Sequence, residues 1–316
     1  MAVSPLGATV FHPTWSPDEL LERKGSRTVS VVIPALNEQD TVAGVVASVR
    51  GLLGGLVDEL LVVDSGSIDR TVADARAAGA TVYTREEALP GVRPRPGKGE
   101  VLWRSLAVAR GDLIVFVDSD LVAPSPLFVP SLLAPLLADD ELCLVKGFYR
   151  RPLAGSGPGG LGGGRVTELL ARPLLTALVP DLADLIQPLG GEYAATREFL
   201  TAIPFAPGYG VEIGIVLDAW KRRGARAIGQ VDLGIRVHRN RPTHELAAMS
   251  RQVVATLLAR LGIPDSGVAL RQYLPHGSRW LTTDTDLDLH DRPAMATLID
   301  VLATADGAVP PEIGVH

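Results

Sequence analysis

Two acidic residues, one position apart, follow an apolar stretch and could bind a metal ion. The tripeptide Asp118-Ser119-Asp120 comes directly after Leu113 to Val117, a run typical of a buried parallel strand. Because open α/β sheets bind ligands outside the carboxyl ends of their strands, both carboxylates would lie where a ligand binds. Carboxylate oxygens suit Mg²⁺ or Mn²⁺, which usually also bind phosphates of a substrate. The pattern favours a metal–diphosphate site and leaves open that the acids only cap the next turn.

Two earlier predicted strands also end in polar residues that would face the same crevice. Pro34-Ala35-Leu36-Asn37-Glu38 follows the first predicted strand, and Asp64-Ser65-Gly66-Ser67 follows the second. The Asp64 carboxylate could accept hydrogen bonds from a base or a ribose. For Asn37 and Asp69 the alternative is a role as helix caps, each worth about 1 kcal/mol.

A lysine between two glycines could reach a phosphate group. The stretch Gly97-Lys98-Gly99 lies near Arg93 and Arg95, which invites comparison with a phosphate-binding P-loop. The comparison fails, because the glycine spacing is wrong, no Ser or Thr follows Lys98, and prolines fill the loop. Lys98 remains a candidate point charge for a phosphate or a base, with a solvated loop lysine as the alternative.

The second half of the chain carries further candidate groups. The stretch Arg236-x-His238-x-Asn240 ends a predicted strand, and a neutral His238 could be a third metal ligand or a structural histidine. Glu212 begins a predicted helix, where it could also simply complement the helix dipole. Arg165 and Thr167 follow a glycine-rich loop at a helix start, which favours an anion site, although Arg165 could be an ordinary surface residue.

Composition narrows the class of protein. The chain has 316 residues, of which 47% are hydrophobic, enough for one large α/β domain with a sizeable core. A formal net charge of −6 without a long basic block gives no support to nucleic-acid binding. The single Cys143 excludes an intrachain disulfide, which fits a reducing cytosol and a role in core packing. Because no apolar run reaches membrane-spanning length and the N-terminus lacks a signal-peptide pattern, we expect a soluble cytoplasmic protein without stable membrane insertion.

The order of the predicted elements defines the fold class. From Val29 to about Tyr149 strands alternate with helices, which predicts an α/β protein with a Rossmann-like, doubly wound, mostly parallel sheet. The stretch from Gly155 to Gly164 holds seven glycines in ten residues and predicts a mobile loop. Further strands are expected at 81–84 and 142–148, and Gly190 to Ala195 is expected to be a turn that leads into a strand. Residues 227–238 are expected to form a strand hairpin or one long strand around Gly234, and the residues after the helix at 243–261 are weakly patterned. Helices are expected at 37–50, 69–78, 99–109, 165–178, 211–223 and 243–261.

The chain resembles retaining glycosyltransferases of the GT-A fold and, more narrowly, the actinobacterial glucosyl-3-phosphoglycerate synthases. The resemblance covers most of the chain, from about Val29 through the His238–Asn240 region. The narrower match rests on the loop leading to Arg165, on Tyr209 to Glu212 and on Arg236 to Asn240. The most telling motifs are Val32 to Glu38, Asp64 to Ser67, Gly97 to Gly99, Asp118 to Asp120 and Gly190-Gly191-Glu192. The first, second and fourth also occur broadly in inverting transferases, so they indicate the fold and the type of donor.

The resemblance implies transfer of glucose from UDP-glucose to 3-phosphoglycerate, with retention and a divalent cation, usually Mg²⁺. The product would begin the pathway to methylglucose lipopolysaccharides. Asp120 and His238 would bind the metal, Asp118 would contact the nucleotide or sugar, Arg236 would lie near the diphosphate, and Glu212 would lie near the transferred glucose. The residues implied to hold the UDP portion are Pro34, Leu36, Glu38, Ser65, Lys98 and Ser119. Those implied to hold phosphoglycerate are Gly164, Arg165, Thr167 and Asn240.

The resemblance also implies a division of the chain and an oligomeric state. Residues 1–28 would form an N-terminal extension and 29–150 the nucleotide-sugar-binding half. Residues 151–265 would form the acceptor-binding half of the same domain, and 266–316 a C-terminal extension. Members of the family are typically homodimers, so we expect a homodimer here.

Other functions stay open at this point. A related transferase with another donor or acceptor, such as a mannosyl-3-phosphoglycerate synthase or a polyprenyl-phosphate glycosyltransferase, would share most of these motifs. A nucleotidyltransferase would need a glycine-rich nucleotide loop near the N-terminus, which the chain lacks. A non-catalytic UDP-sugar sensor could dispense with an acceptor pocket, so Arg165, Thr167 and Asn240 argue against it.

Overall fold

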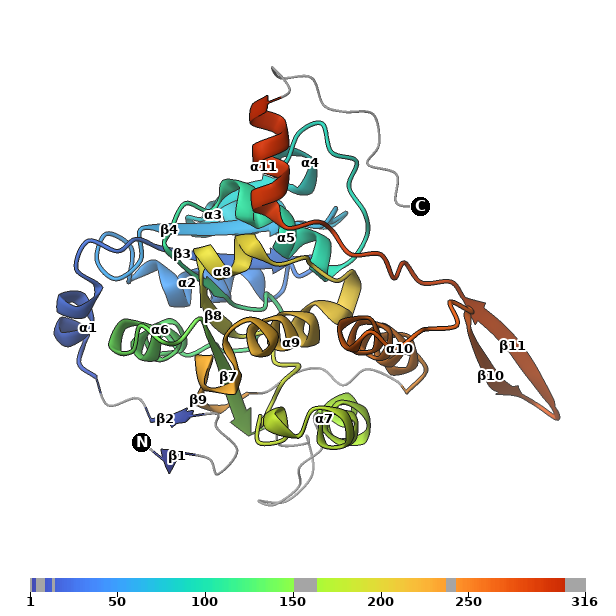
Figure 1. Ribbon diagram of the computed structural model, residues 1–316. Coiled ribbons are helices and arrows are strands. Elements are labelled where there is room, and N and C mark those ends of the chain that lie inside the picture. Colours follow the sequence, from blue (N-terminus) through green and yellow to red (C-terminus); the bar gives the residue numbers. More distant parts are fainter. Residues whose placement is uncertain (1, 4–8, 13–14, 151–163, 237–242, 305–316) are drawn as a thin grey trace.

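One mixed sheet forms the centre of the protein. The computed structural model describes residues 2–3, 9–12, 15–150, 164–236 and 243–304. Within these residues nine strands form a sheet in the order β1-β2-β9-β7-β8-β6-β3-β4-β5 (Figure 1). Their bounds are β1 Ala2–Val3, β2 Thr9–Phe11, β3 Val29–Ala35, β4 Glu59–Asp64, β5 Thr81–Thr84, β6 Leu113–Phe116, β7 Leu144–Arg150, β8 Tyr193–Thr196 and β9 Ile228–Ile235.

The sheet is mostly parallel, as predicted, with one reversed strand near its centre. Strands β6, β3, β4 and β5 pair in parallel, as do β2, β9 and β7. Strand β8 is antiparallel to both of its neighbours, β6 and β7. Because β8 runs the other way, the residues before it reach the same edge as the residues that follow β6. Strand β1 is antiparallel to β2.

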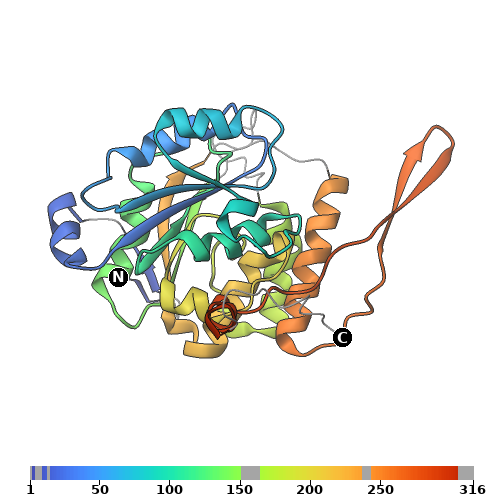
Figure 2. The ribbon, with the colours of Figure 1, turned by 90° about the horizontal axis from the view of Figure 1, so that it is seen from above.

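Helices cover both faces of the sheet, so the protein is doubly wound (Figures 1 and 2). Strand β3 shows the division, since Val31 and Ile33 pack in one core cluster while Val32 packs in the other. The first cluster holds side chains of α1 Pro17–Lys24, α2 Val42–Arg50, α3 Thr71–Ala78 and α6 Phe128–Ala138. The second holds side chains of α4 Arg85–Ala88, α5 Lys98–Val108, α7 Arg172–Leu178, α8 Arg197–Ala202, α9 Val211–Arg223, α10 Thr243–Leu261 and α11 Met295–Thr304.

Several predicted elements have the expected bounds. Strand β5 and helices α9 and α10 span the predicted residues, because each has clear apolar periodicity. The expected strand end at Pro34 is wrong, since β3 continues through Pro34 to Ala35. The Pro34 nitrogen faces the β6 side, where pairing already ends at Val32, so the missing N–H removes no ladder bond. Cys143 is fully buried, as predicted, and burial raises the pKa of its thiol to about 11.

The C-terminal part is more ordered than its weak pattern suggested. Strands β10 Leu270–His276 and β11 Arg279–Thr285 pair as an antiparallel arm that projects from the body (Figures 1 and 2). After the arm, the chain returns to the body, where Phe205 and Arg292 exchange backbone hydrogen bonds of 3.0 and 2.8 Å. Helix α1, helix α6 with its internal Pro135, and helix α11 were not predicted. Among the described residues, no helix combines the length and apolar character needed to cross a membrane.

Candidate active site

Asp118 and Asp120 lie at the carboxyl edge of the sheet, as predicted. They follow β6, and the Val117 amide still donates to the Val32 carbonyl at 3.1 Å, which fixes where they leave the sheet. The Asp118 side chain is 19% exposed and that of Asp120 is 43% exposed. The backbone of Gly191, just before β8, lies against the Asp118 carboxylate, because a Cβ there would be 2.3 Å from Oδ2. Only glycine fits this contact without a shift.

Lys98 joins Asp118 to Glu212. Its ammonium lies 2.6 Å from Asp118 Oδ1 and 2.7 Å from Glu212 Oε1. Two helices that both begin at this edge, α5 and α9, provide Lys98 and Glu212, and the Glu212 side chain is only 5% exposed. Burial alone would lower the pKa of Lys98, but the two carboxylates raise it well above its usual value. Lys98 is therefore a fixed cation in a partly buried site, and the alternative of a solvated loop lysine is wrong.

Arg236 is the second cation of the site. One of its guanidinium nitrogens lies 2.6 Å from Asp120 Oδ1 and 3.4 Å from Asp118 Oδ2. The other nitrogen lies 3.0 Å from Glu192 Oε1. Burial would lower the pKa of Arg236, but Glu192 and its other partners raise it further above its usual range. Arg236, which is predicted to contact the diphosphate, thus pairs with both Asp118 and Asp120. Together with Lys98 it gives the site two cations beside these carboxylates.

Glu192 and Tyr149 complete this cluster and were not among the predicted site residues. Glu192 is fully buried, and the Tyr149 hydroxyl donates to its Oε2 at 2.9 Å. Burial raises the pKa of Glu192, while the Arg236 guanidinium opposes that rise by favouring the carboxylate. The motif Gly190-Gly191-Glu192 was the signal that could have revealed Glu192. Nothing in the sequence pattern singles out Tyr149.

The loops after β3 and β4 meet, as predicted, at this edge of the sheet. The Ser65 amide donates to the Ala35 carbonyl at 2.8 Å, and the Asn37 amide donates to the Ser67 hydroxyl at 2.8 Å. Asn37 has a φ of 55°, and its Oδ1 accepts from the Ile68 amide at 3.0 Å. The alternative role of Asn37 as a helix cap is therefore wrong, since α2 begins at Val42 and Asn37 instead joins the two loops.

Asp64 anchors the second of these loops. Its Oδ2 accepts from the Gly66 and Ser67 amides, both at 2.9 Å, while its buried Oδ1 has no hydrogen-bond partner among the described residues. Of the other residues expected at the nucleotide, Pro34 lies within β3, Ser65 and Ser119 are largely buried, Leu36 is half exposed and Glu38 is partly buried. A buried acceptor beside an exposed apolar side chain fits a base and a ribose. Asp69 binds the Thr71 amide and hydroxyl at the start of α3, close to its predicted capping role.

The acceptor residues follow a stretch that the structure does not describe. Gly164 has a φ of 81°, its carbonyl accepts from the Glu168 amide at 2.9 Å, and Thr167 is buried. The residues 167–171 that follow Arg165 form one π-helical turn before α7, and such turns are frequent at functional sites. Arg172 ties this stretch to the Leu185 and Ile186 carbonyls at 3.2 and 2.7 Å. The predicted loop 155–164 lies outside the described residues except for Gly164, so its mobility stays a prediction.

The described residues fit part of a divalent-metal site. Asp120 gives one oxygen to Arg236 and keeps a half-exposed carboxylate, which suits a hard ion that also binds substrate phosphates. No group of three or more His, Cys, Asp or Glu side chains gathers around one point in the described part of the chain. His238 and Asn240, predicted to bind the metal and the acceptor, lie outside the described residues, two and four positions beyond Arg236.

Comparisons with known proteins identify the family. Residues 30–157 match the profile described as Glycosyl transferase family 2. The chain is 61% identical over 288 residues to the glucosyl-3-phosphoglycerate synthase of Mycolicibacterium smegmatis, which covers 91% of this chain and 95% of that relative. The chain belongs to the glucosyl-3-phosphoglycerate synthase family. It is therefore a glycosyltransferase, as predicted.

More distant relatives and solved structures of the family agree. The glucosyl-3-phosphoglycerate synthase of Petrotoga mobilis is 44% identical over 245 residues, covering 76% of this chain and 75% of that relative. The crystal structure of the Mycobacterium tuberculosis glucosyl-3-phosphoglycerate synthase with Mn²⁺, UDP and phosphoglyceric acid has a TM-score of 0.87 and 57% identity. It covers 93% of this chain and 99% of that chain. The expected GT-A-type fold class is confirmed.

Proposed function

We propose that this protein transfers glucose from UDP-glucose to 3-phosphoglycerate, with retention of configuration and with Mg²⁺ or Mn²⁺. The observation that supports this most is the cluster in which Lys98 and Arg236 flank Asp118 and Asp120 at the carboxyl edge of the sheet. A nucleotide diphosphate brings negative charge to a site that already holds two fixed cations. The family supplies the substrates, since structures of the Mycobacterium tuberculosis relative contain UDP-glucose and phosphoglyceric acid.

Each charged group has a role as UDP departs. Negative charge grows on the diphosphate while positive charge grows at the anomeric carbon, and preorganised charges that stabilise both are usually the largest catalytic contribution. Lys98 and Arg236 lie where they can face the diphosphate, and Asp120, with His238, would hold the metal. A bound divalent ion would neutralise charge on the leaving group. Glu212 and Asp118 provide the negative charge that faces the glucose.

Front-face attack fits the surroundings of Glu212 better than a double displacement. In a double displacement Glu212 would have to act as the nucleophile. Its carboxylate, however, is held by the Lys98 ammonium at 2.7 Å, which lowers its nucleophilicity. In front-face attack a leaving diphosphate oxygen accepts the proton of the acceptor hydroxyl, and Glu212 stabilises the developing cation. The product then keeps the α configuration and leads toward methylglucose lipopolysaccharides.

One incubation tests the proposal against its alternatives. The protein is mixed with UDP-glucose or GDP-mannose, Mg²⁺, and a panel that contains 3-phosphoglycerate, glycerate and a polyprenyl phosphate. We expect glucosyl-3-phosphoglycerate with an α linkage, identified by mass spectrometry and by the anomeric proton coupling. Transfer of mannose or transfer to the polyprenyl phosphate would support another transferase. Binding of UDP-glucose without any transfer would support the non-catalytic sensor.

Arg165 is expected to pair with the phosphate of 3-phosphoglycerate, aided by Thr167 and the start of the helix. Replacing Arg165 with lysine should lower kcat/KM for phosphoglycerate by roughly tenfold or more, because an ammonium cannot reproduce a bidentate guanidinium contact. The KM for UDP-glucose should change little. The measurement is steady-state kinetics with each substrate varied, and the matched control is Arg70→Lys, at an exposed arginine that pairs only weakly with Asp74. Equal efficiency of the wild type on glycerate and phosphoglycerate would sink this assignment.

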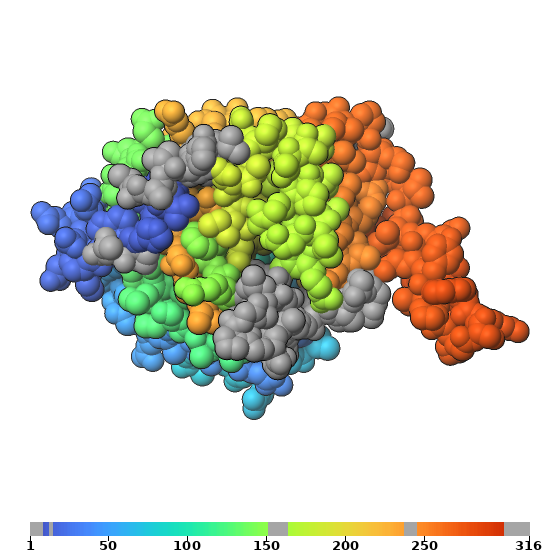
Figure 3. Space-filling model, turned by 90° about the horizontal axis from the view of Figure 1, so that it is seen from below, coloured from blue at the N-terminus to red at the C-terminus, as the bar shows by residue number. Residues whose placement is uncertain are grey.

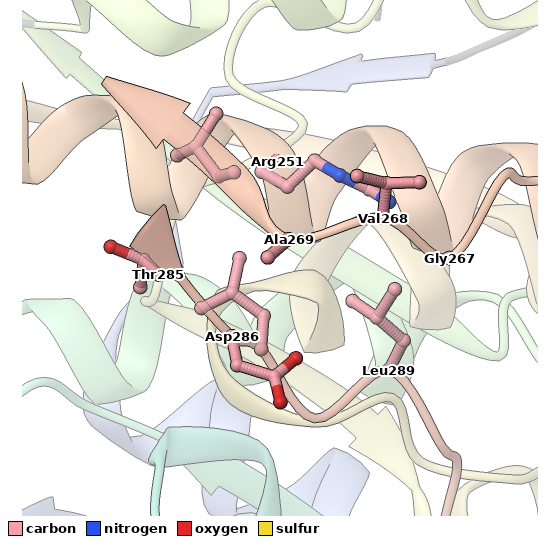
Figure 4. A pocket seen from close by; sticks show the side chains of 9 residues that line it. Arg251, Gly267, Val268, Ala269, Thr285, Asp286 and Leu289 are labelled. Carbon is pink, nitrogen blue, oxygen red and sulfur yellow. The ribbon is translucent and has the colours of Figure 1, made fainter. Parts of the chain in front are cut away.

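The β10–β11 arm is the surface that we assign to a homodimer. A two-stranded hairpin alone is marginally stable in water, yet this arm projects from the body with its side chains exposed (Figure 3). Tyr273 and Trp280 are 62% and 68% exposed on one of its faces, and Leu274 lies opposite Leu281 on the other. At its base the arm meets α10 around a small pocket that Arg251 lines (Figure 4). Arg251 also pairs with Asp265 at 2.6 Å. The base of the arm is therefore fixed while its apolar side chains are uncovered, which suits a second copy of the chain.

Replacing Trp280 with glutamate should weaken the dimer by roughly 30-fold, because a buried tryptophan anchor is worth about 2 kcal/mol or more. The measurement is molar mass by light scattering across a dilution series, starting from the 33.4 kDa monomer mass. Leu21→Glu, at an exposed leucine of α1 on the body, is the matched control. A wild type that stays monomeric, or a Trp280→Glu variant that dimerises normally, would refute the arm as the interface.

The location of this protein in the cytoplasm stays a prediction.

A further inference from the structure

Lys146 is a buried lysine beneath the site that no step above uses. It lies in β7, in register with Tyr193 of β8 and Gln230 of β9, and is only 2% exposed. Leu144, two residues earlier in β7, packs in the core cluster that contains α5 and α9. Because side chains two residues apart in a strand point to the same face, Lys146 points to the face on which Lys98 and Glu212 lie. Its ammonium donates to the Gly190 carbonyl at 2.5 Å and lies 4.4 Å from the centre of the Tyr193 ring.

A lysine at this position is costly for the fold. An ammonium taken out of water loses its hydration, and no carboxylate of a described residue forms an ion pair with Lys146. Burial lowers the pKa of Lys146 to about 8, and the more distant carboxylates of Glu212 and Glu192 only partly oppose this. Lys98, from α5, adds repulsion, and Asp118 adds attraction. An apolar side chain would satisfy this part of the core at lower cost, so the ammonium points to a role outside packing.

The Gly190 carbonyl that Lys146 binds belongs to the turn that carries the site. The next residue, Gly191, lies against the Asp118 carboxylate, with a Cβ position only 2.3 Å from Oδ2. The residue after that, Glu192, pairs with Arg236 at 3.0 Å. A shift of this turn would therefore move the backbone that limits Asp118 and the carboxylate that holds Arg236. Lys146 contacts neither Asp118 nor Arg236 directly in the structure.

We propose that Lys146 is a positioning residue that fixes the Gly190–Gly191 turn and thereby sets the orientation of the Asp118 carboxylate for glucose transfer. Lys146 acts through the Gly190 carbonyl, and its ammonium also lies over the Tyr193 ring. This inference rests on the proposed glucose transfer. It assigns Lys146 to turnover and not to the binding of UDP, because the loops after β3 and β4 hold the nucleotide end of the site.

The test compares Lys146→Met with a matched variant of another buried lysine. Lys24→Met is that control, since Lys24 is 7% exposed and its ammonium also donates to a backbone carbonyl, that of Gly55, at 2.8 Å. Lys24 differs from Lys146 in that it also pairs with Asp58 at 2.8 Å. Lys24 lies in α1, away from the site. We expect Lys146→Met to lower kcat by about tenfold to 100-fold, as small misplacements of catalytic groups do, with UDP affinity nearly retained. Calorimetry measures UDP affinity with Mg²⁺, and melting temperatures confirm that both variants are folded.

The outcomes separate this inference from the proposed function. If the wild type forms no glucosyl-3-phosphoglycerate, the proposed function fails. If the wild type transfers glucose and Lys146→Met keeps kcat within about twofold, only the inference fails. An equal loss of kcat in Lys24→Met would also overturn it.

A second variant covers the case in which Lys146→Met does not fold. Gly191→Ala would push a methyl group against Asp118 and should give the same loss of kcat with UDP affinity retained. Gly44→Ala is its control, because a Cβ at Gly44 meets nothing within 4 Å. A Gly191→Ala variant with the turnover of the wild type would show that the position of this turn does not matter.

Discussion

Replacing Asp120 with alanine is expected to lower turnover with UDP-glucose and 3-phosphoglycerate by roughly 100-fold or more, as loss of a main electrostatic stabiliser does. The variant removes the half-exposed carboxylate that we expect to bind the metal. It also removes the partner of Arg236 at 2.6 Å, so the guanidinium can turn toward Asp118 or Glu192. Both changes weaken the stabilisation of the leaving diphosphate. The measurement is kcat at saturating substrates over a range of Mg²⁺ concentrations.

The metal dependence distinguishes this effect from a general loss of structure. In the wild type, UDP binding measured by calorimetry should weaken strongly when a chelator removes the divalent ion, whereas in Asp120→Ala it should depend little on the ion. Asp140→Ala is a suitable control, because the Asp140 side chain is 96% exposed and pairs with Arg27 only at 3.5 Å. Asp140 precedes β7, at the edge of the sheet opposite the site. Near-normal activity of Asp120→Ala in the presence of chelator would reject the assignment of Asp120.

Replacing Glu212 with glutamine is expected to slow transfer by roughly 100-fold while leaving the affinity for UDP nearly intact. The change removes the negative charge that faces the transferred glucose but keeps the size of the side chain. Lys98 would retain Asp118 at 2.6 Å, so the cation beside the diphosphate stays in place. The expected signature is a fall in kcat without a matching change in UDP binding. Single-turnover kinetics and calorimetry measure the two quantities separately.

The control for Glu212→Gln is Glu198→Gln, since the Glu198 side chain is 83% exposed and pairs with Arg223 at 3.1 Å on the surface.

Quenched reactions of the wild-type enzyme decide between the two retaining mechanisms. Under front-face attack no glucosyl adduct of the wild-type enzyme accumulates. Mass spectrometry of quenched reactions that finds glucose on Glu212, or a product with a β linkage, would overturn our account of the chemistry.

The sequence alone was sufficient to predict which residues of the site lie together at the ends of parallel strands. The carboxyl ends of parallel strands meet at one edge, so motifs after each predicted strand could be placed together without knowing the sheet order. The structure brings Asp118, Asp120 and Arg236 together in this way, and the starts of helices α5 and α9 add Lys98 and Glu212. Helix periodicity was equally sufficient for α9 and α10, whose bounds agree with those predicted.

Residues whose position depends on tertiary contacts could not be predicted. Glu192 precedes its strand, and it reaches the site only because β8 runs antiparallel, which no local pattern reveals. Asn37 is of a residue type that often caps helices, but its side chain accepts a hydrogen bond from the Ile68 amide in another loop. From the sequence alone, Lys146 is only a charged residue within an otherwise apolar strand. Its contact with Gly190 forms across the sheet.

The stretch just before α11 looked weakly patterned because ion pairs and single hydrogen bonds hold it, whereas α11 itself packs in the core through Met295 and Leu298. Arg292 donates to Glu100 at 2.6 Å, and the Trp103 indole donates to the Pro293 carbonyl at 2.8 Å. Both partners lie on α5, the helix that begins with Lys98. A sequence separation of about 190 residues makes such contacts invisible to any window of local sequence.

The pairing of β2 with β9 sets a constraint on synthesis by the ribosome. Thr9 to Phe11 align in parallel with Gly229 to Val231, so the strand made early can join the sheet only after about 220 further residues have been translated. At typical bacterial elongation rates that interval is roughly 10 to 40 s. During it the edge of β2 that will pair with β9 has no strand partner, because β9 does not yet exist. The nascent chain thus has to keep one edge of β2 unpaired until the residues of β9 have been synthesised.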